Sequence, residues 1–327
     1  HLFAYRKARY PVVALCDVDR GRAESRRREF YPQADVHTDY RDVLARDDIE
    51  VVDVTPHPLQ RAPILEAALR AGKHVLSQKP FVLDLDFGRR LVRLAQRRGL
   101  RLAVNQNGRW APHFAYIREA VHRGLIGEVV SVHMSMHWDH NWVRDFPFNR
   151  IRHLILFDFA IHWFDMLHCL MRGRKARRVY ASYAKSPGQT ARPKLLAQAA
   201  VEYADAQATL VFDGDVRIGG QDRVFVGGTR GSIWSLGFHE QRRCPKVTLT
   251  TERGACSPRL RGHWFPDGFH GTMGELLCAI EQRREPSHNA RENLGSLALC
   301  FAAVESAETH AAVTPGSCTK LRPGSVL

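Results

Sequence analysis

The hydrophobic pattern of the first hundred residues alternates between short apolar runs and amphipathic stretches. PVVALCD at 11–17 and VVDVT at 51–55 are rich in β-branched residues and read as buried strands, and two similar runs follow before residue 105. Stretches with the 3.6-residue period of a helix lie between these runs, and the one at 59–72 closes on a glycine. Repeated strand–helix units of this kind predict a doubly wound α/β fold with a parallel sheet.

The pattern changes after Arg109. A helical stretch is followed by segments in which apolar and polar residues alternate with a period of two, separated by glycine and aspartate turns. This alternation predicts a mostly antiparallel sheet with one face solvated or packed against a partner. The helical stretches at 271–284 and 293–310 would cover one face of that sheet or return to the first domain. We therefore predict two domains, residues 1–108 and residues 109–327.

The first clear strand ends in an acidic residue, Asp17. In a Rossmann-like dinucleotide-binding domain, the carboxylate that contacts the ribose follows the second strand, and the first strand leads into a glycine-rich turn. We therefore expect the first domain to be truncated at its N-terminus and to lack its first strand, which is a central one in the usual strand order. Direct pairing of the 11–16 strand with the 51–55 strand would contradict this expectation.

The composition excludes several classes of protein. The chain has 327 residues, of which 44% are hydrophobic and 25% charged, and this suits neither a disordered tail nor a small disulfide-stapled peptide. No apolar run is long enough to span a membrane, and the first residues do not read as an export leader, so we expect a cytoplasmic protein with no membrane partner. The seven cysteines, Cys244 among them, form no CxxC pair and favour reduced thiols over a disulfide framework or a zinc ribbon.

The net charge of +14 raises the question of nucleic-acid binding. Only eight of the 48 basic residues are lysine, and the denser arginine groups, such as 26–28 and 89–98, lie on stretches that read as outer faces of helices. Solvated helix faces explain this distribution better than a nucleic-acid surface does, and attraction of an anionic ligand is a second explanation. We predict no nucleic-acid partner.

One glycine-rich segment, VFVGGTRGSIW, has the look of a phosphate-binding loop. Gly227, Gly228 and Gly231 lie between two alternating segments, however, and no helix follows them. We predict a hairpin turn at this position.

Two residues at the ends of predicted strands are candidates for ligand contact. Asp17 could accept both hydroxyls of an adenosine ribose and would repel a 2′-phosphate, which favours NAD over NADP. Its alternative role is the N-cap of the next helix, which Asp19 could also supply. Lys79 follows another strand, and Pro80 after it favours an extended backbone that holds the lysine side chain outward. An amine placed there could bind a substrate hydroxyl or share in its proton transfer.

Three ionisable residues lie on one otherwise apolar predicted helix. Asp158, His162 and Asp165 are spaced by four and three residues, so they share one stripe of that helix. A carboxylate one turn before a histidine can fix its tautomer and raise its basicity, as a general base requires. The structural alternative is a satisfied buried ion pair.

A metal site is a further alternative for this region. His153, Asp158 and His162 have ligand-like types and spacings, and so do His133, His137 and His140. The second group falls on an alternating segment, which would send its members to opposite faces of a sheet. We predict no metal.

Taken together, these motifs resemble the Gfo/Idh/MocA family of nicotinamide-dependent oxidoreductases. The resemblance rests on the strand that closes on Asp17, on TPHPLQ, SQKP, NQNGRWAPHF and DFAIHWFD in this order, and on HGTMGELLCAIE and TPG near the C-terminus. It implies that Lys79, Asp158 and His162 act on a sugar or polyol hydroxyl. It implies a homo-dimer or homo-tetramer formed through the open face of the second domain's sheet. It also implies cofactor contacts at Asp17, Thr55, Pro56, His57, Gln60, Gln78, Lys79 and Asn107.

The chain departs from the family pattern in three places. The glutamate of the family's Glu-Lys-Pro motif is Gln78, which removes a negative charge beside the lysine and keeps hydrogen-bonding groups. The family's Thr-Pro-Asn-x-x-His motif reads TPHPLQ, so His57 and Gln60 occupy its two polar positions. The glycine-rich turn before the catalytic aspartate is replaced by RHLI at 152–155. Side chains of this replacement and of the irregular segment before it could reach the substrate, and the candidates are Trp142, Arg144, Arg152 and His153.

The expected activity is an NAD-dependent hydride transfer at a hydroxyl-bearing carbon of a sugar, inositol or related polyol. His162, oriented by Asp158, would take or return the hydroxyl proton, and Lys79 would polarise the same oxygen. Two alternatives stay open: a non-catalytic dinucleotide-sensing regulator or binding protein of the same fold, and a glycosidase that uses NAD in a redox-assisted elimination.

Overall fold

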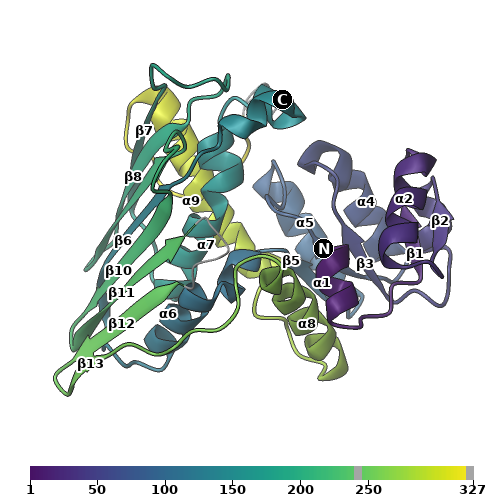
Figure 1. Ribbon diagram of the computed structural model, residues 1–327, viewed down its shortest axis with the longest axis horizontal. Helices are drawn as coiled ribbons and strands as arrows, with labels where there is room; N and C mark the ends of the chain where they lie inside the picture. Colours follow the sequence, from purple (N-terminus) through teal and green to yellow (C-terminus); the bar gives the residue numbers. More distant parts are fainter. Residues whose placement is uncertain (239–244, 322–327) are drawn as a thin grey trace. The chain divides into compact units, whose positions relative to one another are not determined.

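The computed structural model describes residues 1–238 and 245–321, so Cys244 lies outside the described residues. The described chain divides into two compact units (Figure 1). The first unit holds His1–Val82, Asp86–Asn107 and Phe265–Asn293. The second unit holds Leu83–Leu85, Gly108–Trp264 and the chain from Leu294 onward.

Strands and helices alternate through the first unit, as the hydrophobic pattern predicts. Asp19 and Asp39 cap the second and third helices by accepting hydrogen bonds from backbone N–H groups of the first turn. The first helix is an addition that the pattern did not predict. The helices are α1 (Leu2–Lys7), α2 (Arg20–Phe30), α3 (Tyr40–Leu44), α4 (Pro58–Arg70) and α5 (Leu85–Arg97), and the strands are β1 (Ala14–Cys16), β2 (Asp35–His37), β3 (Val51–Val54), β4 (His74–Ser77) and β5 (Leu102–Val104).

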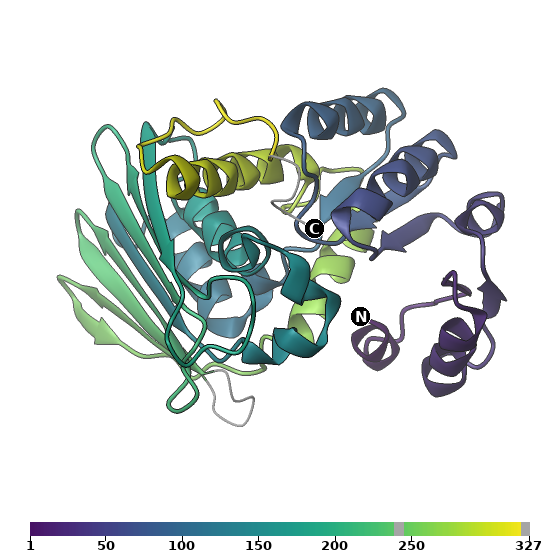
Figure 2. The same ribbon diagram turned by 90° about the horizontal axis from the view of Figure 1, so that it is seen from above.

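The parallel strands of the first unit form two separate sheets. β1 pairs with β2, and β3, β4 and β5 pair in that order. Among the described residues β1 does not pair with β3, so the pairing that would contradict the expected gap is not observed (Figure 2). A cavity of about 720 Å³ is lined by both of these strands together with Met273 and Leu277.

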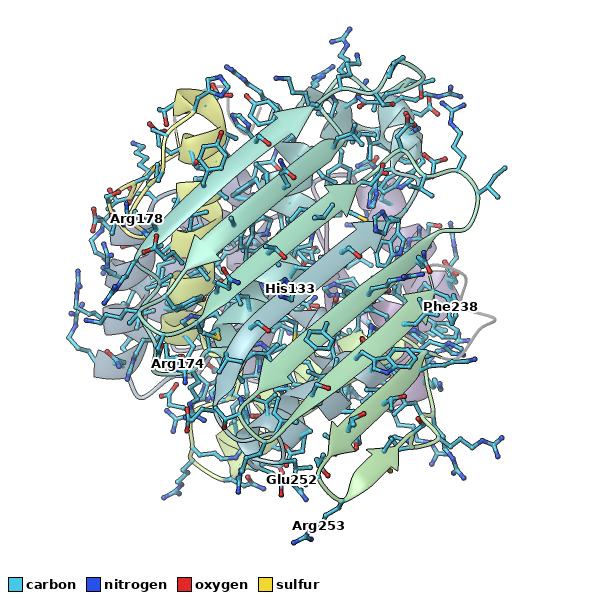
Figure 3. All side chains as sticks on the ribbon, turned by 90° about the vertical axis from the view of Figure 1, so that its left-hand side faces the viewer. His133, Arg174, Arg178, Phe238, Glu252 and Arg253 are labelled. Carbon is cyan, nitrogen blue, oxygen red and sulfur yellow. The ribbon has the colours of Figure 1, made fainter. Side chains whose placement is uncertain are left out.

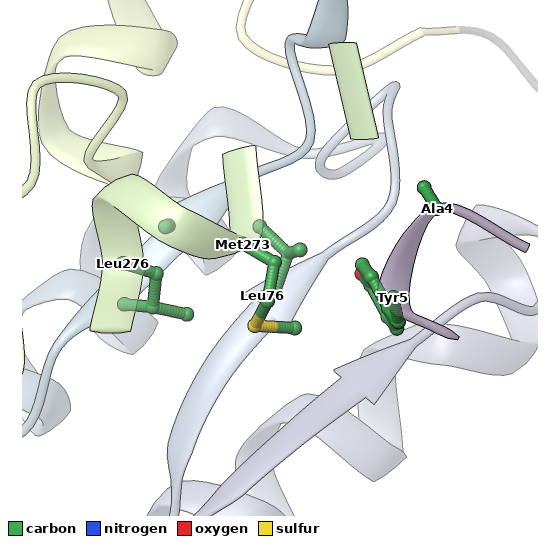
Figure 4. Packing of buried hydrophobic residues seen from close by; sticks show 6 residues of the cluster. Ala4, Tyr5, Leu76, Met273 and Leu276 are labelled. Carbon is green, nitrogen blue, oxygen red and sulfur yellow. The ribbon is translucent and has the colours of Figure 1, made fainter. Parts of the chain in front are cut away.

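Helix α8 (Asp267–Glu281) packs into the first unit although it comes late in the chain. Its buried residues Met273 and Leu276 form a cluster with Tyr5, Leu76 and Ala103 (Figure 4). Removing these side chains from water is the physical reason why residues 265–293 return to the parallel sheet. The sequence left two places open for this helical stretch, and it lies in the first unit. The predicted domain bounds, 1–108 and 109–327, stay a prediction.

An eight-stranded sheet is the scaffold of the second unit. The strand order is β13-β12-β11-β10-β6-β9-β8-β7, and all neighbours are antiparallel except β6 and β9, which confirms the mostly antiparallel sheet. Gly228 pairs with Gly231 at the end of the β10–β11 hairpin, so the predicted hairpin turn is confirmed. The sequence pattern did not predict β8. The strands are β6 (Val129–His137), β7 (Arg178–Ala184), β8 (Leu196–Glu202), β9 (Gln207–Asp213), β10 (Gln221–Gly228), β11 (Gly231–Phe238), β12 (Lys246–Thr251) and β13 (Gly254–Cys256).

Helices cover one face of this sheet and leave the other face open (Figure 1, Figure 3). On the covered face, Trp163 meets Phe212 of β9 with 5.8 Å between ring centroids, and Ser306 Oγ accepts a hydrogen bond from the N–H of Ala181 on β7. The open face carries His133 at the middle of β6 (Figure 3). The helical elements are α6 (Pro112–His122), α7 (Ile161–Leu170), α9 (Ala290–Thr309), the short turns η1 (Asn107–Trp110), η2 (Asn141–Asp145) and η3 (Pro147–Arg150), and the π-helical turn η4 (Ile155–Phe159).

No helix within residues 1–238 and 245–321 combines the length and the apolar character that crossing a membrane requires.

Candidate functional site

The carboxyl ends of β3, β4 and β5 meet at one edge of their sheet. Val54 is in register with Ser77, and Ser77 with Val104, so Thr55, Gln78 and Asn105 follow three neighbouring strands. The backbone continues this pairing for one step, because the N–H of Gln78 donates to Val54 O at 3.0 Å and that of Asn105 donates to Ser77 O at 2.8 Å. Ligands of open parallel sheets bind at this kind of edge.

Asp17 follows β1, is half-buried and is one of the residues that line the 720 Å³ cavity. Its Oδ1 accepts a hydrogen bond from the N–H of Asp19 at 2.9 Å. Asp19 itself accepts from the N–H of Arg22 and is the N-cap of α2. The helix-cap role that competed with ribose binding therefore belongs to Asp19, and ribose binding by Asp17 stays a prediction.

A network of polar side chains lies at the edge of the β3–β5 sheet, and sequence reasoning missed it. His1 Nδ1 lies 2.6 Å from Asp53 Oδ2, and the hydroxyl of Tyr5 donates to the same oxygen at 2.8 Å. His1 Nε2 lies 3.0 Å from the side-chain amide nitrogens of both Gln78 and Asn105. The charge of Asp53 inside the apolar run VVDVT was the signal that could have revealed it.

The pKa of His1 reflects this environment. Burial acts to lower it, but the charge of the Asp53 carboxylate and its hydrogen bond raise it by more, so the pKa lies above the ordinary value. The Asp53 carboxylate acts on the Nδ1 side of the ring, while on the other side Nε2 faces the amide nitrogens of Gln78 and Asn105, which are hydrogen-bond donors.

Gln78 and Lys79 form the turn after β4, followed by a cis peptide bond to Pro80. Gln78 Oε1 accepts the N–H of Lys79 at 2.8 Å while its amide nitrogen faces His1. Both ends of this amide are thus used inside the protein, and the side chain fixes the start of the turn. Lys79 is half-buried. Cofactor contact by Gln78 and the catalytic role of Lys79 stay predictions.

The other predicted cofactor contacts lie around the start of α4 and the end of β5. Thr55 and Gln60 are exposed, and His57 precedes the first turn of α4 at its N-cap position. Asn107 is buried and begins η1, where Gly268 of α8 leaves room for it: a Cβ at Gly268 would lie 2.7 Å from Asn107 O. Cofactor contact by these four residues and by Pro56 stays a prediction.

In the second unit, Asp158 lies on the π-helical turn η4. The N–H of Ala160 donates to Ile155 O at 2.8 Å, five residues back, and single π turns of this kind are frequent at functional sites. The thiol of Cys300 on α9 donates to Leu156 O at 3.3 Å and supports the turn. Burial raises the pKa of this thiol, and the charge of Asp158 adds to the effect, so the thiol stays protonated as a donor.

His162 lies in the first turn of α7, four residues after Asp158, and both side chains are buried. The spacing of the two residues predicts that both lie on one regular helix. The π turn before α7 shows that the helix is not regular between them. Their role as an oriented general base stays a prediction.

Asp165, the third member of the predicted stripe, has a structural role. Arg109 donates to it through Nε at 2.6 Å and through an Nη at 2.7 Å, and Ser296 Oγ donates at 2.8 Å. Burial acts to raise the pKa of Asp165, but the guanidinium and these hydrogen bonds lower it by more, so the net shift is downward. The ion-pair alternative that the sequence left open therefore describes Asp165.

An aromatic cluster reaches His162 through Trp264, and the sequence pattern did not predict it. The ring of Trp264 stands perpendicular to the imidazole with 5.4 Å between centroids. Trp264 also contacts Phe114 and Trp138 at centroid distances of 5.5 and 5.7 Å. Gly108 makes room for this arrangement, because a Cβ there would lie 2.9 Å from the indole and 3.5 Å from His162 Nδ1. Gly108 in NQNGRW was the sequence feature that could have indicated this close packing.

Two predicted substrate contacts, Arg152 and His153, contact Glu308 of α9. An Nη of Arg152 donates to Glu308 Oε2 at 2.6 Å, and His153 Nε2 lies 3.4 Å from Glu308 Oε1. The hydroxyl of Tyr183 donates to the same carboxylate. Arg152 and Tyr183 thus join the segment before η4 and β7 to α9 through Glu308, and the buried His153 lies beside the same carboxylate. Substrate contact by either residue stays a prediction.

Because the pKa of His153 is lowered in the folded protein, we expect the free energy of unfolding to depend on pH. Burial lowers its pKa to about 4, and the Glu308 carboxylate offsets this only in part. Between the unfolded pKa of about 6.5 and the folded value, the unfolded chain binds more protons, so stability falls as the pH falls, by at most about 3 kcal/mol. We expect His153→Gln to flatten the dependence of the unfolding free energy on pH across this window.

Urea unfolding of wild type and His153→Gln at several pH values from 4 to 7 measures this dependence. His270→Gln, which replaces an exposed histidine, is the control and should retain the wild-type slope. Equal slopes in wild type and His153→Gln would show that His153 is not the titrating group.

Trp142 and Arg144, the other two predicted substrate contacts, lie on η2. Trp142 is exposed and packs against Phe159, the residue after Asp158, with 6.1 Å between centroids. Arg144 is exposed and its Nε lies 3.2 Å from Asp145 Oδ2. Trp142 thus lies next to the turn that carries Asp158, and substrate contact by both residues stays a prediction.

The described structure does not support either of the two alternative metal sites. Within the described ranges, the His, Cys, Asp and Glu side chains form no group of three or more that could hold a metal ion.

Comparison with protein-family models gives matches over most of the chain. Residues 1–106 match the "Oxidoreductase family, NAD-binding Rossmann fold" model, and residues 114–234 match the "GFO/IDH/MocA C-terminal domain" model. The first match covers Asp17, Thr55 and Lys79, and the second covers η4 and α7.

Individual relatives agree with these matches. The chain is 27% identical over 276 residues to inositol 2-dehydrogenase from Rhizobium meliloti, covering 81% of this chain and 80% of that protein. It is 35% identical over 116 residues to an uncharacterised oxidoreductase from Schizosaccharomyces pombe, which is 36% of this chain and only 31% of that protein. Among solved structures, an oxidoreductase from Agrobacterium radiobacter in complex with NAD⁺, L-tartaric acid and magnesium has the same fold, with a TM-score of 0.84 at 19% identity over 97% of this chain and 94% of that one.

Proposed function

Because the chain belongs to the Gfo/Idh/MocA family of oxidoreductases, whose N-terminal domain is an NAD-binding Rossmann fold, we propose that it transfers a hydride between NAD and a hydroxyl-bearing carbon of a sugar, inositol or related polyol. The observation that carries the proposal is the buried Asp158 and His162, four residues apart across a π turn supported by Cys300. Burying an aspartate and a histidine among apolar side chains costs free energy. Buried ionisable groups of this kind are typical of active sites.

The catalytic roles follow from the chemistry of these groups. His162 takes the hydroxyl proton when the substrate is oxidised and returns it in the reverse direction, and Asp158 orients the imidazole and stabilises its protonated form. Lys79 donates a hydrogen bond to the same substrate oxygen. Trp142 and Arg144 contact the substrate, since an indole and a guanidinium bind the faces and hydroxyls of a polyol, and Arg152 and His153 are the weaker candidates because Glu308 already engages them.

The residues of the first unit suit NAD. When bound, this cofactor accepts or supplies the hydride. Asp17 is not used as a helix cap, and its carboxylate would accept the hydroxyls of a ribose and repel a 2′-phosphate. Thr55, Pro56, His57 and Gln60, around the start of α4, contact the cofactor in this proposal together with Gln78, Lys79 and Asn107.

The proposal is tested by incubating the purified chain with NAD and a panel of polyols and sugars while following the absorbance of NADH. We expect turnover with at least one inositol, sugar or sugar alcohol, and higher activity with NAD than with NADP. Binding of NAD without turnover on any panel compound would favour a dinucleotide-sensing protein. Release of a sugar from a glycoside without accumulation of NADH would favour the redox-assisted glycosidase.

The open face of the second unit's sheet supports a homo-dimer or homo-tetramer. Large apolar side chains are exposed on four of its strands, namely Tyr180, Val211, Phe225 and Trp234. A sheet face with such side chains is typical of an interface with a second copy of the chain. The described cysteines are free thiols, which fits the cytoplasmic location proposed for the protein.

Light scattering tests this interface. We expect the wild type to be a dimer or tetramer and Trp234→Glu to shift it toward the monomer, because a charge would be buried on association. Ile218→Glu, which changes an exposed residue outside the strands, is the control and should leave the mass unchanged. A monomeric wild type at micromolar concentration would refute the proposed oligomer.

A further inference from the structure

An arginine lies wholly buried in the first turn of α4. Arg61 has 0% of its surface exposed and is one of the largest fully buried side chains of the described chain. Arginine is rarely buried to this extent, because its charge must be removed from water and its donors need acceptors inside the protein. Its contacts therefore identify what this arginine does.

The guanidinium of Arg61 joins two turns at the edge of the parallel sheet. One Nη donates to Pro56 O at 2.7 Å, and the other Nη donates to Pro80 O. Pro56 lies two residues after the end of β3, and Pro80 lies three residues after the end of β4. Since β3 and β4 are neighbours in register, with Val54 opposite Ser77, the two turns lie side by side.

The shape of the side chain suits this task. A guanidinium is a rigid planar fork with several N–H donors, so two of its nitrogens can hold two carbonyl groups at a fixed separation. A lysine ammonium is a single point on a flexible stem and cannot hold both carbonyls in the same way.

The two turns carry residues to which the proposed function assigns roles. The first turn holds Thr55, Pro56 and His57, proposed to contact the cofactor, and the second places Lys79 immediately before Pro80. Gln78 fixes the start of the second turn through its bond to the N–H of Lys79, and Arg61 fixes its end through Pro80 O.

We propose that Arg61 is a positioning residue that holds Lys79 in a constant place relative to the cofactor-contacting turn after β3. The proposal rests on the roles given above to Lys79 and to the turn at 55–57. Without the guanidinium, the two carbonyls lose their common donor and each turn moves independently. Lys79 then spends less time in the position that the reaction requires.

A purely structural role, in which Arg61 only stabilises the fold, makes a different prediction, and matched variants separate the two. Arg61→Met removes the donors and keeps most of the volume. Leu65→Ala removes a fully buried side chain one helical turn later on α4 and destabilises the unit without removing a hydrogen-bond donor from either turn. Arg70→Met removes a surface ion pair with Glu66 on the same helix and is the neutral control.

The first measurement is amide hydrogen exchange of the chain without cofactor. Each protein is measured at the same number of degrees below its own melting temperature. We expect the amides of segments 55–57 and 78–82 to exchange faster in Arg61→Met than in wild type or in Leu65→Ala. This measurement does not depend on activity, so it also holds if no panel compound is turned over. Equal exchange in Arg61→Met and Leu65→Ala would overturn the proposal.

The second measurement is kinetic and uses the substrate found in the panel. We expect Arg61→Met to lower kcat by about 10- to 100-fold, as misplacement of a catalytic group does, with a smaller change in the KM of the substrate. In a Lys79→Ala background the same substitution should lower kcat by less than about 3-fold, because a residue that acts through Lys79 has nothing left to position. Full additivity of the two substitutions would overturn the proposal.

If Arg61→Met does not fold, Arg61→Lys replaces it in both measurements. It retains the charge and one donor, so we expect intermediate exchange rates in 78–82 and an intermediate kcat. Wild-type exchange and kcat in Arg61→Lys would show that the fork is not needed.

Discussion

Alanine in place of His162 is expected to lower turnover by about 10²- to 10⁴-fold, the usual loss when a general base is removed. The affinity for NAD should change by less than about 3-fold, because His162 lies on α7 in the second unit whereas the proposed cofactor contacts lie in the first. Steady-state kinetics with the panel substrate and calorimetric titration with NAD measure the two quantities. Asp158→Asn should cause a similar but smaller loss, since the imidazole is kept and only its orientation and basicity change.

Lys79→Ala provides the companion measurement. If Lys79 and His162 act on one substrate oxygen, the double variant should lose much less than the product of the two single losses. Lys246→Ala, which removes an exposed lysine of β12, is the control and should retain wild-type kinetics. Near-normal turnover in both His162→Ala and Lys79→Ala would refute the catalytic assignment.

The second large effect is expected at the buried pair of Arg109 and Asp165. Removing either partner leaves an uncompensated charge in the interior, so Arg109→Met or Asp165→Asn should lower the unfolding free energy by about 3–5 kcal/mol. Replacing both partners by apolar residues, as Arg109→Met with Asp165→Leu, should recover most of this loss, because no charge remains unpaired. Urea unfolding followed by tryptophan fluorescence measures each variant.

A surface pair is the matched control for this experiment. Arg123 donates to Glu119 at 2.6 Å on the exposed side of α6, and Arg123→Met should cost less than about 1 kcal/mol. Equal losses at the buried and the exposed pair would contradict the argument. The pKa of Asp165 is lowered in the folded state, so the contribution of the buried pair is complete at neutral pH and is lost only as the pH falls below the ordinary carboxyl range.

Local pattern was sufficient for much of the fold. The alternation of β-branched runs with helical periodicity predicts the strands of the first unit, and the period-two segments predict most strands of the second. β8 was missed because its sequence, LAQAAVE, consists mostly of small and polar residues and has only one β-branched side chain, Val201. The sequence correctly predicts a helix at α8. It does not show to which unit the helix belongs, because that depends on contacts with Tyr5 and Leu76, which are far away in the chain.

The sequence predicts the candidate catalytic residues better than it predicts the groups that pack around them. Lys79, Asp158 and His162 could be identified because motif spacing is a local property. The π turn under Asp158 could not, because it depends on the support of α9, whose Cys300 lies 144 residues after Leu156. Trp264 beside His162 also escaped sequence reasoning, since an isolated tryptophan in an irregular segment carries no periodic signal.

Backbone preference and hydrophobic periodicity depend on near neighbours, so most elements and the motif residues at their ends can be predicted from the order of the amino acids. The partner of each ionisable group depends on the three-dimensional fold. Asp165 faces Arg109, His153 faces Glu308, and Asp53 faces His1, and each pair joins residues more than fifty positions apart. The free energy of a buried charge depends on which group is brought against it, and strand register and helix packing across the whole chain make that choice.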